Sequence, residues 1–506
     1  MTHPSAQTDP FVHERMPPPE LWPQMRYDLP ELQVPDQANV VTTLFDAASA
    51  KGWGNRLMLR APERTVTYDE AQAEVNRIAD MLMRDFKLEP GNRVLLRGGN
   101  SIGMALAWLG VVKAGLIAIA TMPLLRAAEL DQIIEKSRPS LAMCDVTLLA
   151  DMVVAAQDAP TLLPIVAFGD PQRADGMEAR SARRSSDFAG CATSADDVAL
   201  LAFTSGTTGK PKACITTHRE ILAACNAWPR HVLRANENDV VTGSPPLAFT
   251  FGLGGLLIFP MWAGASVYYS GVRYNPESIV RRMRDNGITI CYTAPTYYRQ
   301  MAPYVKALGV PSLRICVSAG EALPDSTRQL WKDATGIELI DGIGGTEVFH
   351  IYISSSGKDV RPGAIGKVVP GYQARIVDDN DNEVPHGTIG RLAMIGPTGC
   401  RYMDDDERQR RYVSNGWNHP GDSFTQDEDG YFYYQARNDD MIVTSGYNVG
   451  GPEVEDCLLT HPAVAACGVV GKPDEVRGHI IKAFVVLRAE HAPNEAMADT
   501  LKEYVK

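Results

Sequence analysis

The fold prediction starts from one segment, Leu200-Leu201-Ala202-Phe203-Thr204-Ser205-Gly206-Thr207-Thr208-Gly209-Lys210-Pro211-Lys212. Residues 198–203 are apolar, which predicts a short buried strand. The two glycines after this run allow the backbone to bend so that successive N–H groups point at one anion. The hydroxyls and lysines of the same segment add hydrogen-bond donors and positive charge. The segment therefore predicts a loop that binds a polyphosphate at the end of a strand.

The residues after this loop predict a helix. Thr217 and Glu220 have the spacing of a capping box, and Ile221, Leu222 and Trp228 fall on one helical face. The predicted order is thus strand, phosphate-binding loop, helix. The loop is not the P-loop of NTPases, because two residues rather than four separate its glycines. Taken alone, so short a loop also fits an ordinary surface turn.

Length predicts two or more domains, and the composition is ordinary for a soluble globular enzyme. The chain has 506 residues, of which 45% are hydrophobic and 22% charged. Its net charge of −12 argues against nucleic acid as a partner. The nine cysteines include no CxxC pair, which favours a reducing cytoplasm over a disulfide framework or a metal ribbon. Two uncharged or nearly uncharged stretches, residues 103–123 and 247–269, contain several glycines and are interpreted as core segments rather than membrane spans.

Strands and helices alternate along the chain, which predicts an α/β fold with mostly parallel sheets flanked by helices. Residues 361–395 predict a β-rich subdomain of the same unit. We place the domain boundary at the charged cluster after Ala436, so that a large domain spans residues 1–436 and a small, mobile α+β lobe spans residues 437–506. The proline-rich residues 1–37 predict an extended arm packed on the large domain.

A second informative stretch runs over residues 243–255 and contains Phe249, Thr250 and Phe251 before a cluster of glycines. Glycines at the start of an apolar helix allow a ligand or another backbone to approach closely. The two phenylalanines are candidates for the walls of a flat apolar pocket. Plain core packing is the alternative for each of these residues.

A third stretch, residues 339–350, ends an apolar run at Asp341 and continues with three glycines before Thr346 and Glu347. This pattern predicts a strand that ends at Asp341. A bound polyphosphate usually carries Mg²⁺, which prefers carboxylate and phosphate oxygens. Glu347 is therefore a candidate metal ligand. A glycine-rich turn with a solvated glutamate is the alternative.

Taken together, these stretches resemble the acyl-adenylate-forming, or AMP-binding, superfamily. The loop after Phe203 matches its pyrophosphate loop, and Gly344-Gly345-Thr346-Glu347 matches its Gly-x-Thr-Glu motif. The run Asp-Gly-Ile-Gly-x-Thr-Glu followed by His350 is most similar to benzoate- and 2-aminobenzoate–CoA ligases. The resemblance implies an ATP-dependent carboxylate–CoA ligase that converts an aryl acid, through an acyl-adenylate, to its CoA thioester with release of AMP and pyrophosphate. It implies ATP, Mg²⁺ and CoA as cofactors.

The resemblance also implies roles for individual residues. Catalytic or metal-binding roles fall on Thr204, Lys210, Glu347 and Asp439, with Thr204 and Glu347 at Mg²⁺ and Asp439 at the hinge of the small lobe. The carboxylic acid is implied to contact Phe249, Thr250, Phe251, Gly345 and His350. Contacts to nucleotide or CoA are implied for Ser205, Gly206, Thr207, Thr208, Gly209, Lys212, Ala319, Gly320, Glu321, Asp341, Gly342, Ile343, Gly344, Thr346, Asp422, Arg437 and Gly446.

Alternatives remain at this point. The acid could be a medium-chain fatty acid instead of an aryl acid. The family's catalytic lysine lies in a Pro-x-Thr-x-x-Gly-Lys context that does not occur up to Lys506, which implies an incomplete C-terminal lobe. A protein that binds nucleotide or acyl-adenylate without turnover is therefore a second hypothesis, and a phosphotransferase that forms ADP is a third. The expected partners are a small aromatic acid, ATP and CoA, without nucleic acid or membrane, and a homodimer is left open.

Overall fold

The computed structural model describes residues 4–157, 159, 163–204, 211–271, 275–437, 442–444, 447–474 and 478–505. In this part of the chain the strands form four sheets. The first has the order β6-β5-β3-β4-β7-β8 and is parallel except for β8. Its strands are β3 (Arg93–Arg97), β4 (Ile117–Thr121), β5 (Leu141–Asp145), β6 (Ile165–Phe168), β7 (Val198–Thr204) and β8 (Lys212–Thr217).

All residues of β3 and β4 are buried, as expected for parallel strands that helices cover on both faces. The helices of this half of the chain are α1 (Val40–Ala50), α2 (Tyr68–Asp85), α3 (Ile102–Lys113), α4 (Ala127–Ser137), α5 (Leu149–Gln157), α6 (Met177–Ser181) and α7 (His218–Asn226). The α2 and α7 helices begin with capping boxes at Thr67 and Thr217, so the predicted helix start at Thr217 is confirmed.

The second sheet has the order β15-β14-β13-β12-β11-β9-β10-β1-β2, with parallel pairing from β13 to β1. Its strands are β1 (Leu57–Arg60), β2 (Thr65–Thr67), β9 (Val240–Gly243), β10 (Ser266–Tyr268), β11 (Ile290–Thr293), β12 (Ile315–Ser318), β13 (Leu339–Gly344), β14 (Ile351–Ser354) and β15 (Lys367–Val368). Its helices are α8 (Thr250–Leu253), η6 (Gly254–Ile258), α9 (Phe259–Ala263), α10 (Pro276–Asp285), α11 (Pro295–Leu308) and α12 (Asp325–Thr335). The first three are consecutive and join β9 to β10.

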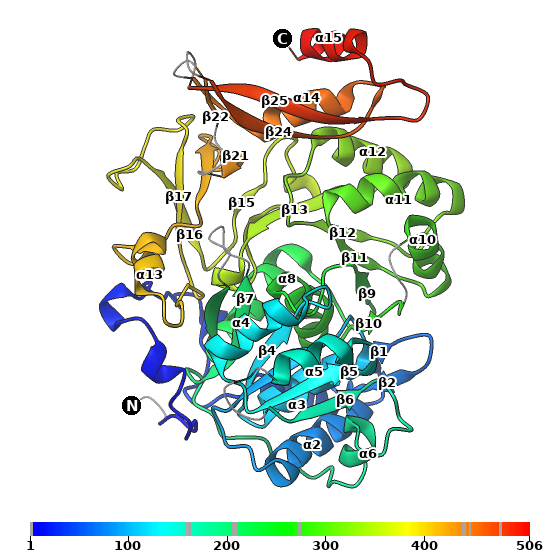
Figure 1. Ribbon diagram of the computed structural model, residues 1–506, viewed down its shortest axis with the longest axis vertical. Helices are drawn as coiled ribbons and strands as arrows, with labels where there is room; N and C mark the ends of the chain where they lie inside the picture. The colour runs from blue at the N-terminus through cyan, green and yellow to red at the C-terminus, as the bar shows by residue number, and fades with distance from the viewer. Residues whose placement is uncertain are drawn as a thin grey trace.

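The third sheet is antiparallel and forms the predicted β-rich subdomain. Its main elements are β16 (Gln373–Val377), β17 (Gly390–Ile395), α13 (Asp406–Tyr412), β18 (Val413–Ser414), β19 (Trp417–Asn418), β20 (Asp422–Gln426) and β21 (Phe432–Arg437). The C-terminal lobe, drawn orange to red in Figure 1, contains β22 (Ile442–Thr444), β23 (Tyr447–Val449), α14 (Gly451–Thr460), β24 (Val464–Asp474), β25 (Gly478–Leu487) and α15 (Glu495–Tyr504). The predicted fold class is confirmed, and the domain boundary at residues 436/437 stays a prediction.

The strand β8 corrects the predicted order of strand, loop and helix. It lies between the predicted phosphate-binding loop and α7. It pairs antiparallel with β7, in a register that places Thr204 opposite Lys212. Residues 213–217 are nearly all apolar, sulfur-containing or β-branched, a composition that favours a strand. The strands on either side of the loop segment thus form an antiparallel pair, and α7 begins at His218, directly after β8.

The end of β13 is a second correction. The predicted strand stops at Asp341, whereas β13 continues through Gly342, Ile343 and Gly344. In this extension it pairs antiparallel with β14, with Gly342 opposite Ser354. A Cβ atom on Gly342 would lie 2.7 Å from the Ile351 side chain, so the glycine permits the close strand pairing.

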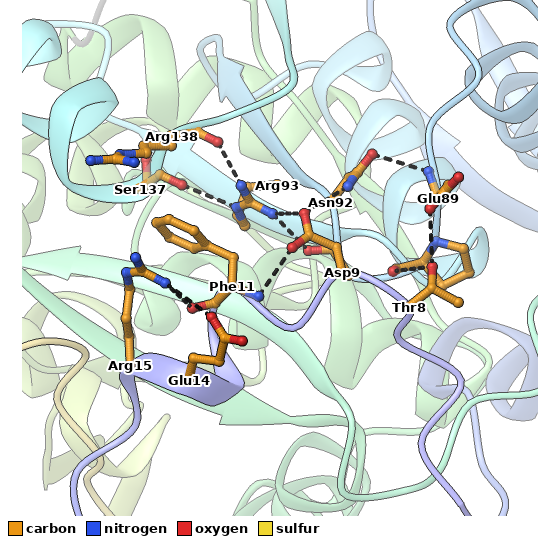
Figure 2. A network of polar contacts seen from close by, with 12 residues as sticks. Thr8, Asp9, Phe11, Glu14, Arg15, Glu89, Asn92, Arg93, Ser137 and Arg138 are labelled. Atoms are coloured by element: carbon orange, nitrogen blue, oxygen red, sulfur yellow. Dashed lines mark hydrogen bonds and ion pairs between the residues drawn. The ribbon is translucent and has the colours of Figure 1, made fainter. Parts of the chain in front are cut away.

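The N-terminal arm is packed on the large domain, as predicted. Asp9 forms an ion pair with the buried guanidinium of Arg93 in β3 and accepts a hydrogen bond from Asn92 at 2.8 Å. Figure 2 shows the Phe11 ring beside the same arginine. The guanidinium carbons of Arg15 and Arg93 lie 3.9 and 4.2 Å from the centre of that ring, within cation–π range. No helix in the described residues has the length and apolar character needed to cross a bilayer.

We expect Asp9→Asn to lower the free energy of unfolding at pH 7 by about 1–2 kcal/mol, because it removes the charge that compensates buried Arg93. Partial burial acts to raise the pKa of Asp9, but the Phe11 backbone N–H and Arg93 hold it below its ordinary value. A carboxyl group whose pKa is lower in the folded than in the unfolded protein stabilises the fold at pH values above its unfolded-state pKa. This stabilisation is lost as the pH falls through the folded-state pKa. The difference in thermal unfolding between Asp9→Asn and the wild type should therefore persist from pH 7 down to about pH 4 and become smaller only near pH 2.

The matched control for this prediction is Asp28→Asn, since Asp28 forms an exposed ion pair with Arg26 on the same arm. We expect it to change stability by less than about 0.5 kcal/mol. Equal effects of the two substitutions would contradict the anchoring role of Asp9.

Candidate active site

A cavity of about 340 Å³ lies where the carboxyl ends of β12 and β13 face α8 and the strands β20 and β21. Ligands of open α/β sheets bind at this edge. Every predicted site residue in residues 249–251, 319–321 and 341–346, together with His350, Asp422 and Arg437, lines it. The full lining comprises Phe249, Thr250, Phe251, Ala319, Gly320, Glu321, Ala322, Asp341, Gly342, Ile343, Gly344, Gly345, Thr346, Phe349, His350, Ile351, Ile365, Asp422, Tyr434 and Arg437.

Asp341 is a buried carboxyl in β13, where it pairs in register with Ser318 of β12. Its Oδ1 accepts a hydrogen bond from the Gly342 backbone N–H at 2.9 Å, and its Oδ2 lies 3.8 Å from Arg328. Burial raises the pKa of Asp341 to about 7, with Arg328 opposing the rise. The group can thus accept or donate a hydrogen bond near neutral pH.

Asp422 and Arg437 face each other at the start of β20 and the end of β21, because the two strands pair in that register. Arg437 Nη1 lies 3.5 Å from Asp422 Oδ1. Burial raises the pKa of Asp422 to about 6, and the positive charge of Arg437 limits the rise. The residue before Asp422, Gly421, has φ +87°, and a Cβ atom there would lie 3.3 Å from Arg437.

His350 closes the apolar end of the cavity. Its ring lies 4.5 Å from Phe259, 5.2 Å from Trp228 and 5.6 Å from Phe251, measured between ring centroids. Among the described residues, neither ring nitrogen has a hydrogen-bond partner of normal geometry. Burial lowers the pKa of His350 to about 3, opposed only in part by the backbone of Phe251, so the imidazole is neutral at pH 7.

The glycines that follow Phe251 make room for this aromatic wall. A Cβ atom on Gly254 would lie 2.6 Å from His350 Cδ2, and one on Gly255 would lie 2.7 Å from Tyr292 Cε1. The close approach predicted for these glycines is therefore to aromatic side chains. It brings the helix that starts at Thr250 directly against the apolar end of the cavity.

Glu347, Thr204 and Lys212 are predicted site residues that do not line the cavity. Glu347 lies in the turn η7 (Thr346–Val348), and its Oε1 accepts a hydrogen bond from the Tyr402 hydroxyl at 2.8 Å. Thr204 Oγ1 is buried and has no partner in the described part of the chain. The η7 turn contacts β8, the strand that holds Lys212 opposite Thr204.

These residues fit a magnesium ion that enters with the nucleotide. No cluster of three or more metal-binding side chains occurs in the described residues. Mg²⁺ usually takes one or two protein carboxylates and fills its other positions with phosphate oxygens and water. The Glu347 carboxylate and the Thr204 hydroxyl, which is buried without a partner among the described residues, match that donor set.

Several predicted residues lie outside the described part of the chain: Ser205, Gly206, Thr207, Thr208, Gly209, Lys210, Asp439 and Gly446. Sequence analysis also missed some cavity residues, namely Ala322, Phe349, Ile351, Ile365 and Tyr434. Phe349 and Ile351 flank His350 and could have been found by extending that motif. Ile365 and Tyr434 reach the cavity through pairing of distant segments, for which no local signal exists.

The AMP-binding enzyme family model matches residues 46–401, and the model of its C-terminal domain matches residues 453–506. The chain belongs to the AMP-binding enzyme family. The family that the sequence motifs indicated is therefore confirmed for most of the chain.

Similar proteins of this AMP-binding enzyme family include aromatic-acid–CoA ligases. Benzoate–CoA ligase of Thauera aromatica is 33% identical over 94% of this chain and 91% of its own. The structure of an anthranilate CoA ligase in complex with anthranoyl-AMP superposes with a TM-score of 0.88, at 32% identity over 93% of this chain and 91% of the other. A benzoate CoA ligase from Burkholderia xenovorans superposes with a TM-score of 0.84, at 30% identity over 93% of both chains.

Proposed function

We propose that this AMP-binding enzyme activates a small aryl carboxylate of the benzoate or 2-aminobenzoate type as its CoA thioester. One observation carries the proposal: a single cavity joins an aromatic, apolar end at His350 to a polar end at Asp341 and Asp422. The first end suits a flat ring and the second a nucleotide. The aromatic-acid ligases named above, which span nearly the whole chain, support the same assignment.

The enzyme is an AMP-forming acid–thiol ligase that uses ATP, Mg²⁺ and CoA. In the first step the carboxylate oxygen forms a bond to the α-phosphorus while the bond to pyrophosphate breaks. In the second step the CoA thiol forms the C–S bond, AMP leaves, and the thiol proton passes to solvent. The adenylate is needed because a free carboxylate has no good leaving group.

We assign the nucleotide to the polar end of the cavity. Asp422 accepts hydrogen bonds from the ribose hydroxyls, and Arg437 holds that carboxylate in place. Asp341 and residues 319–321 contact the adenine. Glu347 and Thr204 would hold Mg²⁺, which would supply positive charge to offset that of the departing pyrophosphate. Lys212, with residues 205–210 of the loop, adds electrostatic stabilisation worth roughly a few kcal/mol per donor.

A second cavity provides a route for CoA in this proposal. It has a volume of about 440 Å³, lies between β21 and the C-terminal lobe, and shares Tyr434 and Arg437 with the first cavity. A thiol that enters along it reaches the adenylate beside Arg437. In this proposal the C-terminal lobe rotates about Asp439 between the two steps, and pantetheine enters at Gly446. Domain motions of this kind often exchange the groups in an active site.

The aromatic end favours an aryl acid over an aliphatic one. Phe249, Phe251 and Phe349 line the cavity together with His350, and aromatic side chains pack against a flat ring with favourable edge and face geometry. The neutral imidazole offers one donor and one acceptor, so it can bind an amino or hydroxyl substituent of the ring. A free α-amino group would require an acidic partner, and the segment from Pro245 to Gly255 has none.

A panel of acids of similar size tests this proposal: benzoate, 2-aminobenzoate, cyclohexanecarboxylate, hexanoate and octanoate. We expect kcat/KM for AMP formation, with CoA, to be about 10–200-fold higher for the two aryl acids, because a poorly filled pocket loses about 1–3 kcal/mol. Cyclohexanecarboxylate is the matched control, since it keeps the size of benzoate but is not flat. Calorimetric binding of stable acyl-sulfamoyl-adenosine analogues measures recognition separately from turnover. Tighter binding and faster reaction of octanoate would contradict the aryl assignment.

A further inference from the structure

We propose that Tyr402 is a positioning residue that orients the carboxylate of Glu347 for the metal ion. The Tyr402 hydroxyl donates a hydrogen bond of 2.8 Å to Glu347 Oε1 from a segment 55 residues further along the chain. This inference rests on the metal-binding role proposed for Glu347. It adds a residue that does not touch the ligand but sets the direction of one that does.

The backbone on both sides of Tyr402 is hydrogen-bonded to β8, the strand that follows the predicted phosphate-binding loop. The Ile215 N–H donates to the Arg401 carbonyl at 2.9 Å and the Met403 N–H donates to the Ala213 carbonyl at 3.0 Å. Because β8 pairs with β7, the segment that carries Tyr402 has a fixed register to both of these strands.

A buried glutamine holds the other side of the same segment. Gln409 of α13 accepts a hydrogen bond from the Tyr402 N–H and donates one to the Cys400 carbonyl, both at 2.9 Å. It also donates to the Leu21 carbonyl of the N-terminal arm, which lies beside α13 in Figure 1. The Tyr402 backbone is thus held by hydrogen bonds to β8 on both sides and to Gln409 at its own N–H, which fixes the position from which its side chain extends.

The Tyr402 ring is also held. It is 1% exposed, and the ring of Tyr412 packs edge-on against it at 5.7 Å between centroids. The phenol is the donor in this bond, because an ionised carboxylate can only accept hydrogen bonds. A hydrogen bond from a neutral donor to a charged acceptor is among the stronger ones in proteins.

The bond commits one oxygen of Glu347 and leaves the other available. In the described residues, Oε2 has no hydrogen-bond partner. Glu347 lies in a short turn, two residues after Gly345. A glutamate side chain loses conformational entropy when it binds a cation, because several of its bonds can no longer rotate freely. A carboxylate that Tyr402 has already oriented loses less of this freedom, which strengthens metal binding without a new ligand.

The test is Tyr402→Phe, measured by calorimetric titration of ATP at a series of Mg²⁺ concentrations. We expect the Mg²⁺ concentration that gives half of the maximal ATP affinity to rise about tenfold, which corresponds to about 1.4 kcal/mol. Affinity for AMP, which lacks the β- and γ-phosphates, should stay unchanged. This readout does not depend on turnover or on the identity of the acid.

The matched control is Tyr298→Phe, which removes a buried hydroxyl that donates to the Cys291 and Val317 carbonyls in a different part of the core. It should lower the unfolding temperature at least as much as Tyr402→Phe without changing the Mg²⁺ requirement. Tyr402→Phe should also add nothing in a Glu347→Gln background, because it acts through that carboxylate.

Three results would overturn the inference. A Tyr402→Phe protein with the wild-type Mg²⁺ requirement would show that Tyr402 only supports the fold. Effects of Tyr402→Phe and Glu347→Gln that add fully would show that Tyr402 acts elsewhere. If ATP binding to the wild-type protein does not depend on Mg²⁺, the role proposed for Glu347 fails together with this inference.

Discussion

Replacing Glu347 by glutamine is expected to lower the rate of adenylate formation by about 10²–10³-fold, the cost typical of losing one group that stabilises transition-state charge. Glutamine keeps the shape and one acceptor oxygen but removes the negative charge that a hard cation prefers. The charge on the departing pyrophosphate would then be less shielded. Exchange of labelled pyrophosphate into ATP in the presence of benzoate measures this step directly.

The control for this variant is Glu428→Gln, which neutralises an exposed glutamate on a surface turn. It should leave the exchange rate within about twofold of the wild type, since surface substitutions of this kind are usually neutral. AMP affinity should be unchanged in Glu347→Gln, because AMP carries no pyrophosphate. A normal exchange rate in Glu347→Gln would remove Glu347 from the mechanism.

Asp422→Asn is expected to weaken AMP binding by about 10–100-fold, because hydrogen bonds to a charged acceptor contribute about 1.5–3 kcal/mol. The substitution keeps the size of the side chain and one carbonyl oxygen. It also removes the carboxylate that faces Arg437 at 3.5 Å. Calorimetric titration with AMP measures the loss, and an unchanged affinity would place the ribose elsewhere.

The pH dependence of AMP binding gives the same prediction a second readout. Burial raises the pKa of Asp422 to about 6, so the carboxylate that accepts the ribose hydroxyls is lost as pH falls below that value. Wild-type affinity should therefore decrease from pH 7 to pH 5, and Asp422→Asn should remove that part of the decrease. Asp341 also titrates in this cavity, because burial raises its pKa to about 7, so Asp341→Asn separates the two contributions: the part of the decrease that Asp422→Asn removes should persist in Asp341→Asn.

Local sequence predicted much of this fold because short-range signals determined the elements. Residues 198–203 form a buried strand, and the capping box at Thr217 starts a helix. The cavity residues came from motifs in which glycines and polar side chains follow strands, such as Asp341 to Thr346. Where strands are parallel, their carboxyl ends meet at one edge, so motifs that are distant in sequence meet in space.

The parts that sequence could not predict depend on contacts between distant segments. The strand β8 was not predicted from the sequence, because its residues directly follow a loop motif. Its pairing with β7 is what defines it as a strand. The bond from Tyr402 to Glu347 joins segments 55 residues apart, and the ion pair from Asp9 to Arg93 joins segments 84 residues apart. None of these four segments carries a local pattern that identifies its partner, because tertiary packing selects each pair.

The central claim is that one cavity holds the aryl ring and the nucleotide of an acyl-adenylate. A crystal structure with 5′-O-(N-benzoylsulfamoyl)adenosine, a stable analogue of that intermediate, tests it most directly. We predict that the phenyl ring lies against Phe251 and His350 and that both ribose hydroxyls bond to Asp422. An analogue bound in another site, with Asp422 and Glu347 turned away from it, would contradict the account.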